Sequence, residues 1–100
     1  MSIIDLVKQE LVRVREELKL RSEQELKALD GNMLERTYSI FGKEYPLLAW
    51  SESEPNGSLA VIVELRRKGL FWSVTCYREG FTLSEGLSTD LTERELWEYD

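Results

Sequence analysis

The middle of the chain reads Pro55-Asn-Gly-Ser-Leu-Ala-Val-Ile-Val-Glu-Leu-Arg66. It contains Asn56-Gly57, which is the strongest two-residue signal for a β-hairpin, because a type I′ turn needs a positive φ at both positions. The apolar run that follows is rich in β-branched residues, which are typical of strands. The stretch therefore predicts a turn at 56–57 and a strand over residues 58–66.

The residues on either side continue this pattern. Apolar and aromatic runs predict further strands over 35–41, 44–53 and 70–78. A short fifth strand over 81–84 is the alternative to a four-stranded sheet. Short turns are expected at Gly42-Lys43 and Lys68-Gly69. Because short turns join antiparallel strands, we expect an antiparallel β-meander of four to five strands.

The turns also predict which side chains share a face of the sheet. A two-residue turn at Asn56-Gly57 puts Trp50 opposite Val63, and one at Lys68-Gly69 puts Leu65 opposite Trp72. A three-residue loop at 67–69 would instead set Glu64 against Trp72. The favoured turns place one apolar set on a single face: Leu48, Trp50, Leu59, Val61, Val63, Leu65, Trp72, Val74 and Cys76.

A long helix is predicted ahead of the meander, over residues 3–29. Ser2 and Asp5 have the spacing of a capping box, and apolar residues recur every three or four positions from Ile4 to Leu18. The apolar stripe slips after Leu18 and then resumes. Gly31 is a natural stop for the helix.

A short acidic helix is predicted at the other end, over residues 90–100. Thr92 and Glu95 form a second capping-box pattern. A helix this short is not stable alone, so it should dock through Leu91, Leu96 and Trp97. The expected fold is therefore α+β: a long N-terminal helix packed on the meander, closed by a short acidic helix, in one domain over residues 1–100.

The cysteine content and the length of the apolar runs indicate the cellular compartment of the protein. A single cysteine, Cys76, allows no intrachain disulfide, and its apolar surroundings predict a buried, inert thiol. The first ten residues lack the features of a signal peptide, and no apolar run reaches the roughly 18 residues of a membrane span. We therefore expect a cytoplasmic protein with no membrane partner.

The charge is concentrated in the last third of the chain. The net charge is −6, and residues 70–100 hold seven acidic but only two basic groups. A negative field repels phosphate backbones, so nucleic acid is not an expected partner, whereas a basic protein would be favoured. The basic cluster Arg66-Arg67-Lys68 is interpreted as a solvated turn.

Most catalytic chemistry is missing from the sequence. There is no histidine, one cysteine and no glycine-rich phosphate loop. This removes the commonest general base and metal ligand, and thiolate zinc sites. We therefore expect no catalytic residue, no metal site and no cofactor.

One strand motif supports an alternative. Glu64-Leu65-Arg66 resembles the acid-x-lysine strand element of restriction-type nucleases, although arginine replaces lysine and no aspartate lies between Asp30 and Asp90. The resemblance implies a small metal-dependent hydrolase or nuclease that uses strand carboxylates. The main interpretation of Glu64 and Arg66 is instead a charged pair on a partly exposed strand. A small-ligand-binding domain is the other alternative.

The second face of the meander carries the functional prediction. It is also apolar, and the short helix is too small to cover it fully, so part of it should stay open as an interaction site. We therefore expect a non-catalytic interaction module of the adaptor, chaperone or immunity-protein kind, which pairs with itself as a homodimer or with another protein. The candidate interface residues are Tyr38, Ile40, Tyr45, Leu47, Ile62, Phe71 and Tyr77.

Overall fold

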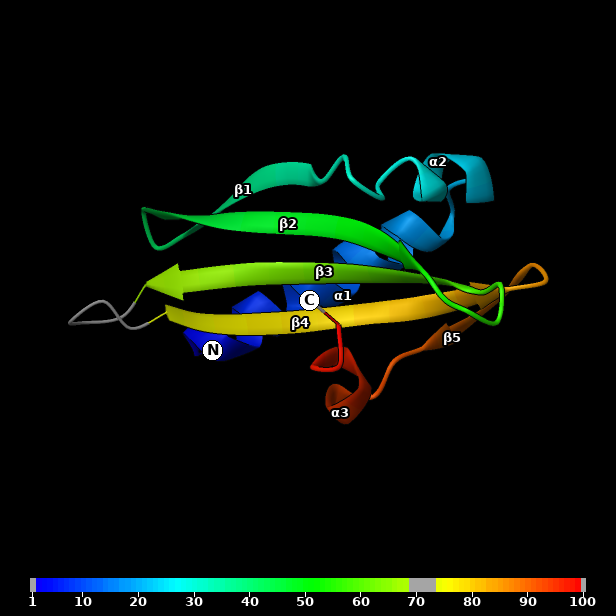
Figure 1. The fold of residues 1–100 in the computed structure, drawn as a ribbon. Coiled ribbons are helices and arrows are strands. Elements are labelled where there is room, and N and C mark those ends of the chain that lie inside the picture. The colour runs from blue at the N-terminus through cyan, green and yellow to red at the C-terminus, as the bar shows by residue number, and fades with distance from the viewer. Residues whose placement is uncertain (1, 69–73, 100) are drawn as a thin grey trace.

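The computed structural model describes residues 2–68 and 74–99 of the chain. Its elements are, in order, α1 (Ile3–Lys19), α2 (Glu23–Lys27), β1 (Leu34–Ile40), β2 (Lys43–Ser53), β3 (Leu59–Lys68), β4 (Val74–Ser84), β5 (Leu87–Asp90) and α3 (Glu93–Leu96). The strands form one antiparallel sheet in chain order, with α1 behind it and α3 in front in the view of Figure 1. This is the predicted α+β fold with a β-meander. Among the described residues, none of the helices has the length and apolarity needed to cross a membrane.

The N-terminal helix is shorter than predicted. Its capping box of Ser2 and Asp5 is confirmed, but α1 ends at Lys19 and a separate helix, α2, follows. The break occurs because Ser22 is extended and its hydroxyl accepts a hydrogen bond from the N–H of Glu25, at 3.2 Å, which starts a new helix. The slip in the apolar stripe after Leu18 was the sign of this break.

The turn between β2 and β3 differs from the predicted one by one residue. Trp50 lies opposite Ile62, not Val63. The N–H of Gly57 donates to the carbonyl of Glu54 at 3.0 Å, and Gly57 has a φ of +89°. Pro55 suits the first central position of a type I turn, so the loop has three residues and a left-handed glycine. The one-residue slip turns every side chain of β2 to the other face.

The turn between β3 and β4 is also misplaced in the prediction. Leu65 lies opposite Tyr77, not Trp72, because β3 runs to Lys68 and β4 begins only at Val74. Trp72, predicted to lie on one apolar face with Leu48 and Trp50, lies outside the described residues. The stretch 81–84 is the second half of β4 rather than a separate strand, and the fifth strand is Leu87–Asp90.

These two registers divide the apolar residues between the faces differently from the prediction. On the face toward α1, the covered face, Val61 and Val63 are fully buried. On the opposite face, the open face, Leu48 and Trp50 pack with Ile62 and with residues of the C-terminus. The predicted single set that combined Leu48 and Trp50 with Val61 and Val63 is therefore wrong. The core of the covered face consists mainly of Val7, Leu11, Val14, Leu18, Leu47, Ala49, Val61, Val63, Leu65 and Phe81.

Candidate functional site

The seven predicted interface residues do not form one surface. Ile62 is fully buried on the open face, and Phe71 lies outside the described residues. The other five belong to the covered face, where α1 lies: Tyr38, Ile40, Tyr45, Leu47 and Tyr77. The two register errors are the reason, because they exchanged the faces of β2 and β4 relative to β3.

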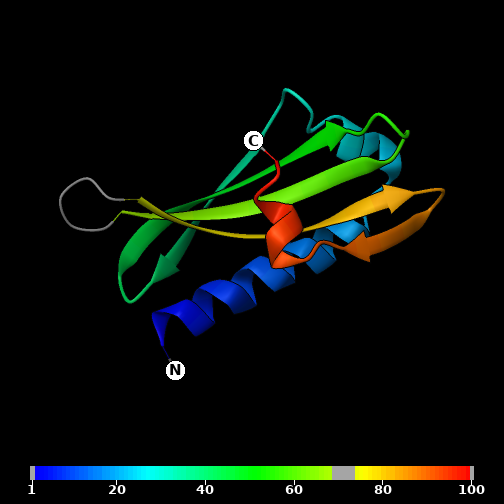
Figure 2. The same cartoon turned by 60° about the horizontal axis from the view of Figure 1, so that its bottom comes forward.

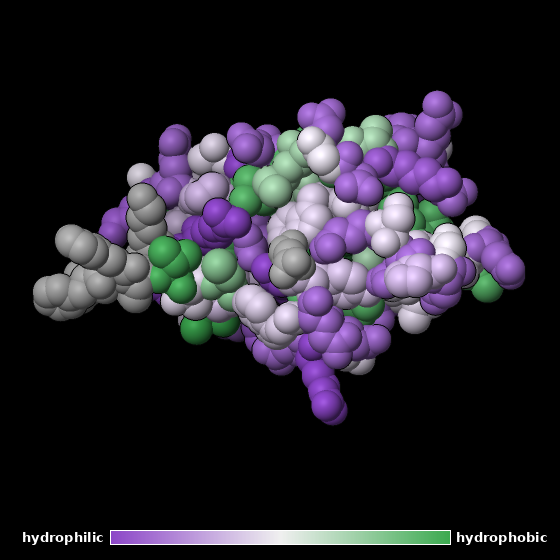
Figure 3. All heavy atoms as spheres, viewed as in Figure 1, coloured by the Kyte–Doolittle hydropathy of each residue, from purple (hydrophilic) through white to green (hydrophobic). Residues whose placement is uncertain are grey.

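The open face brings together a different group of residues, centred on Arg78 of β4. The register aligns Arg78 with Glu64 of β3 and with Leu48 of β2 across the sheet. Figure 3 shows this side of the molecule as a mosaic of hydrophilic and hydrophobic side chains rather than one continuous apolar patch. Part of it is covered by residues 91–99, which we call the C-terminal segment.

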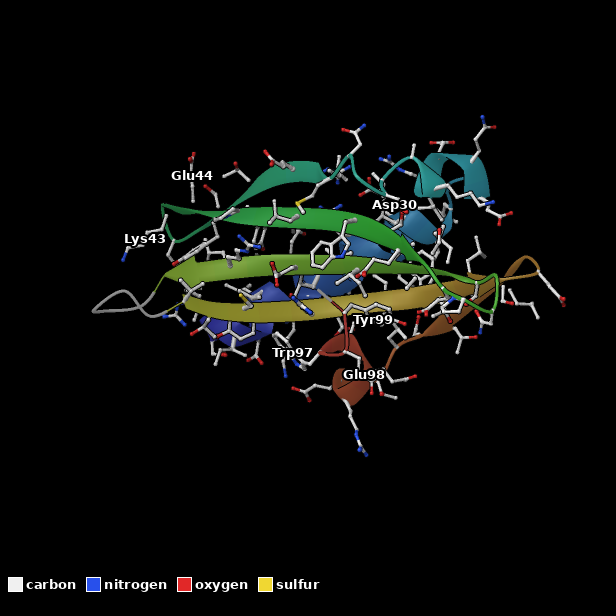
Figure 4. The ribbon with its side chains drawn as sticks, in the orientation of Figure 1. Asp30, Lys43, Glu44, Trp97, Glu98 and Tyr99 are labelled. Atoms are coloured by element: carbon white, nitrogen blue, oxygen red, sulfur yellow. The ribbon has the colours of Figure 1, made fainter. Side chains whose placement is uncertain are left out.

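Arg78 holds the C-terminal segment to the sheet. Its Nη1 donates to the carbonyl oxygens of Leu96, at 3.0 Å, and Tyr99, at 2.8 Å. Its guanidinium carbon lies 4.6 Å from the centre of the Trp97 ring and 5.4 Å from that of Trp50. Figure 4 shows Trp97 and Tyr99 on this side of the sheet. One guanidinium thus combines hydrogen bonds with two cation–π contacts.

A glycine on β4 makes room for the same segment. A Cβ at Gly80 would lie 2.5 Å from the carbonyl oxygen of Val61 and 3.1 Å from Cδ2 of Leu96. The carbonyl of Gly80 also accepts a hydrogen bond from the N–H of Leu91, at 3.0 Å. Leu91 and Leu96 are buried, as expected for a docked helix, whereas Trp97 stays 52% exposed.

The far end of the segment is tied to the β2–β3 turn. The hydroxyl of Tyr99 donates a hydrogen bond to the carboxylate of Glu54. Burial and this neighbouring carboxylate raise the pKa of Tyr99 well above its usual value, so its phenol stays protonated.

Glu64 is the buried charge of the open face. It is 2% exposed, and its carboxylate accepts hydrogen bonds from Nε of Arg66, at 2.8 Å, and Nε of Arg78, at 2.9 Å. Burial raises the pKa of Glu64, but the two arginines outweigh burial and the net pKa is lowered. A carboxylate held ionised in this way is poorly suited to act as a general acid.

Sequence reasoning placed Glu64 incorrectly and missed Arg78. The Glu64–Arg66 pair was interpreted as charges on a partly exposed strand, but the carboxylate is buried. Alternation along β3 could have placed Glu64 and Arg66 on one face. Only the register between β3 and β4 reveals Arg78 as the second partner.

Cys76 lies beside this cluster and is half-buried rather than fully buried. It pairs with Arg66 across the β3–β4 ladder. Burial and the negative charge of Glu64 raise the pKa of the Cys76 thiol. A thiol with a raised pKa is a poor nucleophile at neutral pH.

A hollow of about 240 Å³ opens along the outer edge of β4. Four consecutive residues of the strand, 76–79, line it, although alternate side chains point to opposite faces. The hollow therefore opens on the edge of the strand and not on one face. Its walls come from α1 and from the C-terminal segment: Lys8, Leu11, Leu91, Glu93, Leu96 and Trp97.

The described residues offer no ready metal centre. Within residues 2–68 and 74–99, no three acidic, histidine or cysteine side chains are grouped closely enough to bind a metal ion. The partners of Glu64 are guanidinium groups, where the nuclease alternative would need a second carboxylate.

No family model, no curated protein and no solved structure matches this chain significantly.

Proposed function

We propose that this protein is a non-catalytic interaction module that works as a homodimer, of the adaptor, chaperone or immunity-protein kind. The observation that supports the proposal is a contrast between charged and apolar side chains on the part of the open face near β4. There the charged groups are bonded to one another or to the C-terminal segment, while two large apolar side chains remain exposed. Val74 is 54% exposed and Trp97 is 52% exposed.

The state of the polar groups favours binding over catalysis. Glu64 is bonded to two arginines, which keep it ionised. The Cys76 thiol has a raised pKa, and the chain has no histidine to activate a nucleophile. These groups stabilise an arrangement rather than provide a proton or an electron pair for a reaction.

The same features favour a second copy as the first partner. Exposed aromatic and aliphatic side chains beside a strand edge are typical of an interface, and two-fold dimers are the commonest assemblies of soluble proteins. The acidic groups of residues 70–100 favour a basic protein as the further partner of the dimer.

Light scattering on the purified protein at several concentrations tests the proposal. We expect the native protein to have the mass of two chains and Val74→Glu that of one, because the variant puts a charge into the contact. Leu87→Glu is the matched control, since Leu87 is an exposed apolar residue on β5, outside the proposed contact, and is 74% exposed. A native protein that is monomeric at every concentration contradicts the proposal.

A further inference from the structure

We propose that two copies of the chain pair along the outer edge of β4, antiparallel about a two-fold axis at Cys76, so that one sheet runs through both copies. The inference rests on the proposed homodimer and specifies its geometry. It predicts which main-chain groups bond across the axis and which exposed side chains become buried.

The first half of β4 has an outer edge with no partner strand among the described residues, although α1 and the C-terminal segment form the walls of the hollow along it. β5 pairs only with residues 81–84, so the outer edge of residues 74–79 carries no strand in residues 2–68 and 74–99. An unpaired edge presents N–H and C=O groups that can accept another strand. In Figure 2 this part of β4 runs beyond the end of β5.

The other edge of the sheet, β1, is less suited to pairing. Its side chains on the open face are those of Glu35, Thr37 and Ser39, all of them polar. Polar and charged residues on an edge strand discourage association. The corresponding side chains of β4 begin with Val74 and Cys76, so β4 is the edge with the less polar side chains on the open face.

One hydrogen bond shows which main-chain N–H and C=O groups of β4 point away from β3. The carbonyl of Gly80 points outward, because it accepts from Leu91 on the far side from β3. Main-chain groups of alternate residues in a strand point to the same edge. The N–H and C=O groups of Val74, Cys76 and Arg78 therefore also point outward.

These outward groups select one register. With Cys76 opposite Cys76 of the second copy, Val74 lies opposite Arg78, and all three residues can exchange hydrogen bonds across the axis. A shift that sets Cys76 opposite Arg78 would put Val74 opposite Gly80, whose carbonyl already bonds to Leu91. The register centred on Cys76 is therefore the one that satisfies the whole edge.

The side chains suit this register as well. Val74 would lie beside Arg78 of the second copy. In that copy the Trp97 ring lies against the Arg78 guanidinium. Val74 and Trp97, which are both exposed in one copy, are thus buried against each other at both ends of the contact. On the covered face Thr75 would lie opposite Tyr77, and no like charges face each other directly.

The test uses Cys76, which is the only cysteine of the chain. In a hydrogen-bonded antiparallel pair the two Cα atoms are about 5.5 Å apart. Dibromobimane, which fluoresces when it bridges two neighbouring thiols, is added to the native protein at alkaline pH, because the pKa of the thiol is raised. We expect a fluorescent covalent dimer.

The matched control moves the thiol away from the axis. In the double variant Cys76→Ser, Leu87→Cys, light scattering should still give a dimer, but the reagent should leave the chains unbridged. A second pair of variants does not depend on thiol chemistry. Cys76→Pro removes an outward N–H without breaking the bonds to β3 and should give a monomer, while Cys76→Val keeps the N–H and should remain a dimer.

The outcomes separate the two proposals. A native dimer that dibromobimane does not bridge, or that survives Cys76→Pro, overturns the edge pairing and leaves the proposed function standing. A native monomer overturns both. Bridging of the native dimer together with loss of the dimer in Cys76→Pro supports the edge pairing.

Discussion

Arg78 is the residue on which the open face depends. Its guanidinium neutralises Glu64, bonds two carbonyls of the C-terminal segment and lies against the ring of Trp97. Removal of one partner of a buried ion pair leaves an uncompensated charge, which costs more than the pair itself contributes. The loss should therefore exceed that of an ordinary surface substitution.

We predict that Arg78→Met lowers the free energy of unfolding by about 3–5 kcal/mol in urea titration. The double variant Arg78→Met, Glu64→Leu should recover a large part of this loss, since it replaces the whole pair by apolar side chains. If Arg78→Met unfolds at the same urea concentration as the native protein, Arg78 does not hold the open face together.

Glu64 should also make stability depend on pH. The lowered pKa of its carboxyl means that its contribution is present above the unfolded pKa of about 4.3 and is lost as pH falls through the folded pKa. The free energy of unfolding should therefore fall less between neutral and acidic pH in Glu64→Gln than in the native protein. Equal slopes for the two proteins would contradict the ion pair.

At the scale of elements, the C-terminal segment depends on a close approach at β4. Gly80→Ala would bring a Cβ to 2.5 Å from the carbonyl oxygen of Val61 and would crowd Leu96. We expect a loss of about 1–3 kcal/mol, typical of overpacking. The tryptophan emission, to which Trp97 contributes, should shift as the segment loosens. A variant with native stability and native emission would show that the segment does not need a glycine at position 80.

Most of the elements were predicted from the sequence, but the separate helix α2, the strand β5 and the strand registers were not. The capping boxes at Ser2 and Thr92 and the alternation of the strands mark local structure, and the structure confirms them. The register depends on loop length, and Pro55 before Asn56-Gly57 changed a two-residue turn into a three-residue one. A single residue is enough to exchange the faces of a strand.

The error in the registers is also the reason why the candidate site was not predicted from the sequence. Arg78 and Glu64 lie fourteen positions apart and meet only in the observed β3–β4 register. No local pattern marks such a pair. By contrast, the pattern Ser22-Glu-Gln-Glu25 did carry the signal of a new helix start, since it has the spacing of a capping box.

In the whole molecule, the two faces of the sheet are covered by different parts of the chain. The covered face supplies the main core with α1, and the open face combines a buried ion pair with a docked C-terminal segment. The chain measures about 41 × 24 × 24 Å, and the unpaired part of β4 lies along its side. Pairing there would extend the sheet from one copy into the other, between α1 and the C-terminal segment.

Small-angle X-ray scattering of the native protein in solution tests whether the protein works as a dimer of this chain, as we propose. We predict the mass of two 11.7 kDa chains and a radius of gyration clearly above the 13.8 Å of one chain. The mass of one chain at every concentration measured would rule out the dimer.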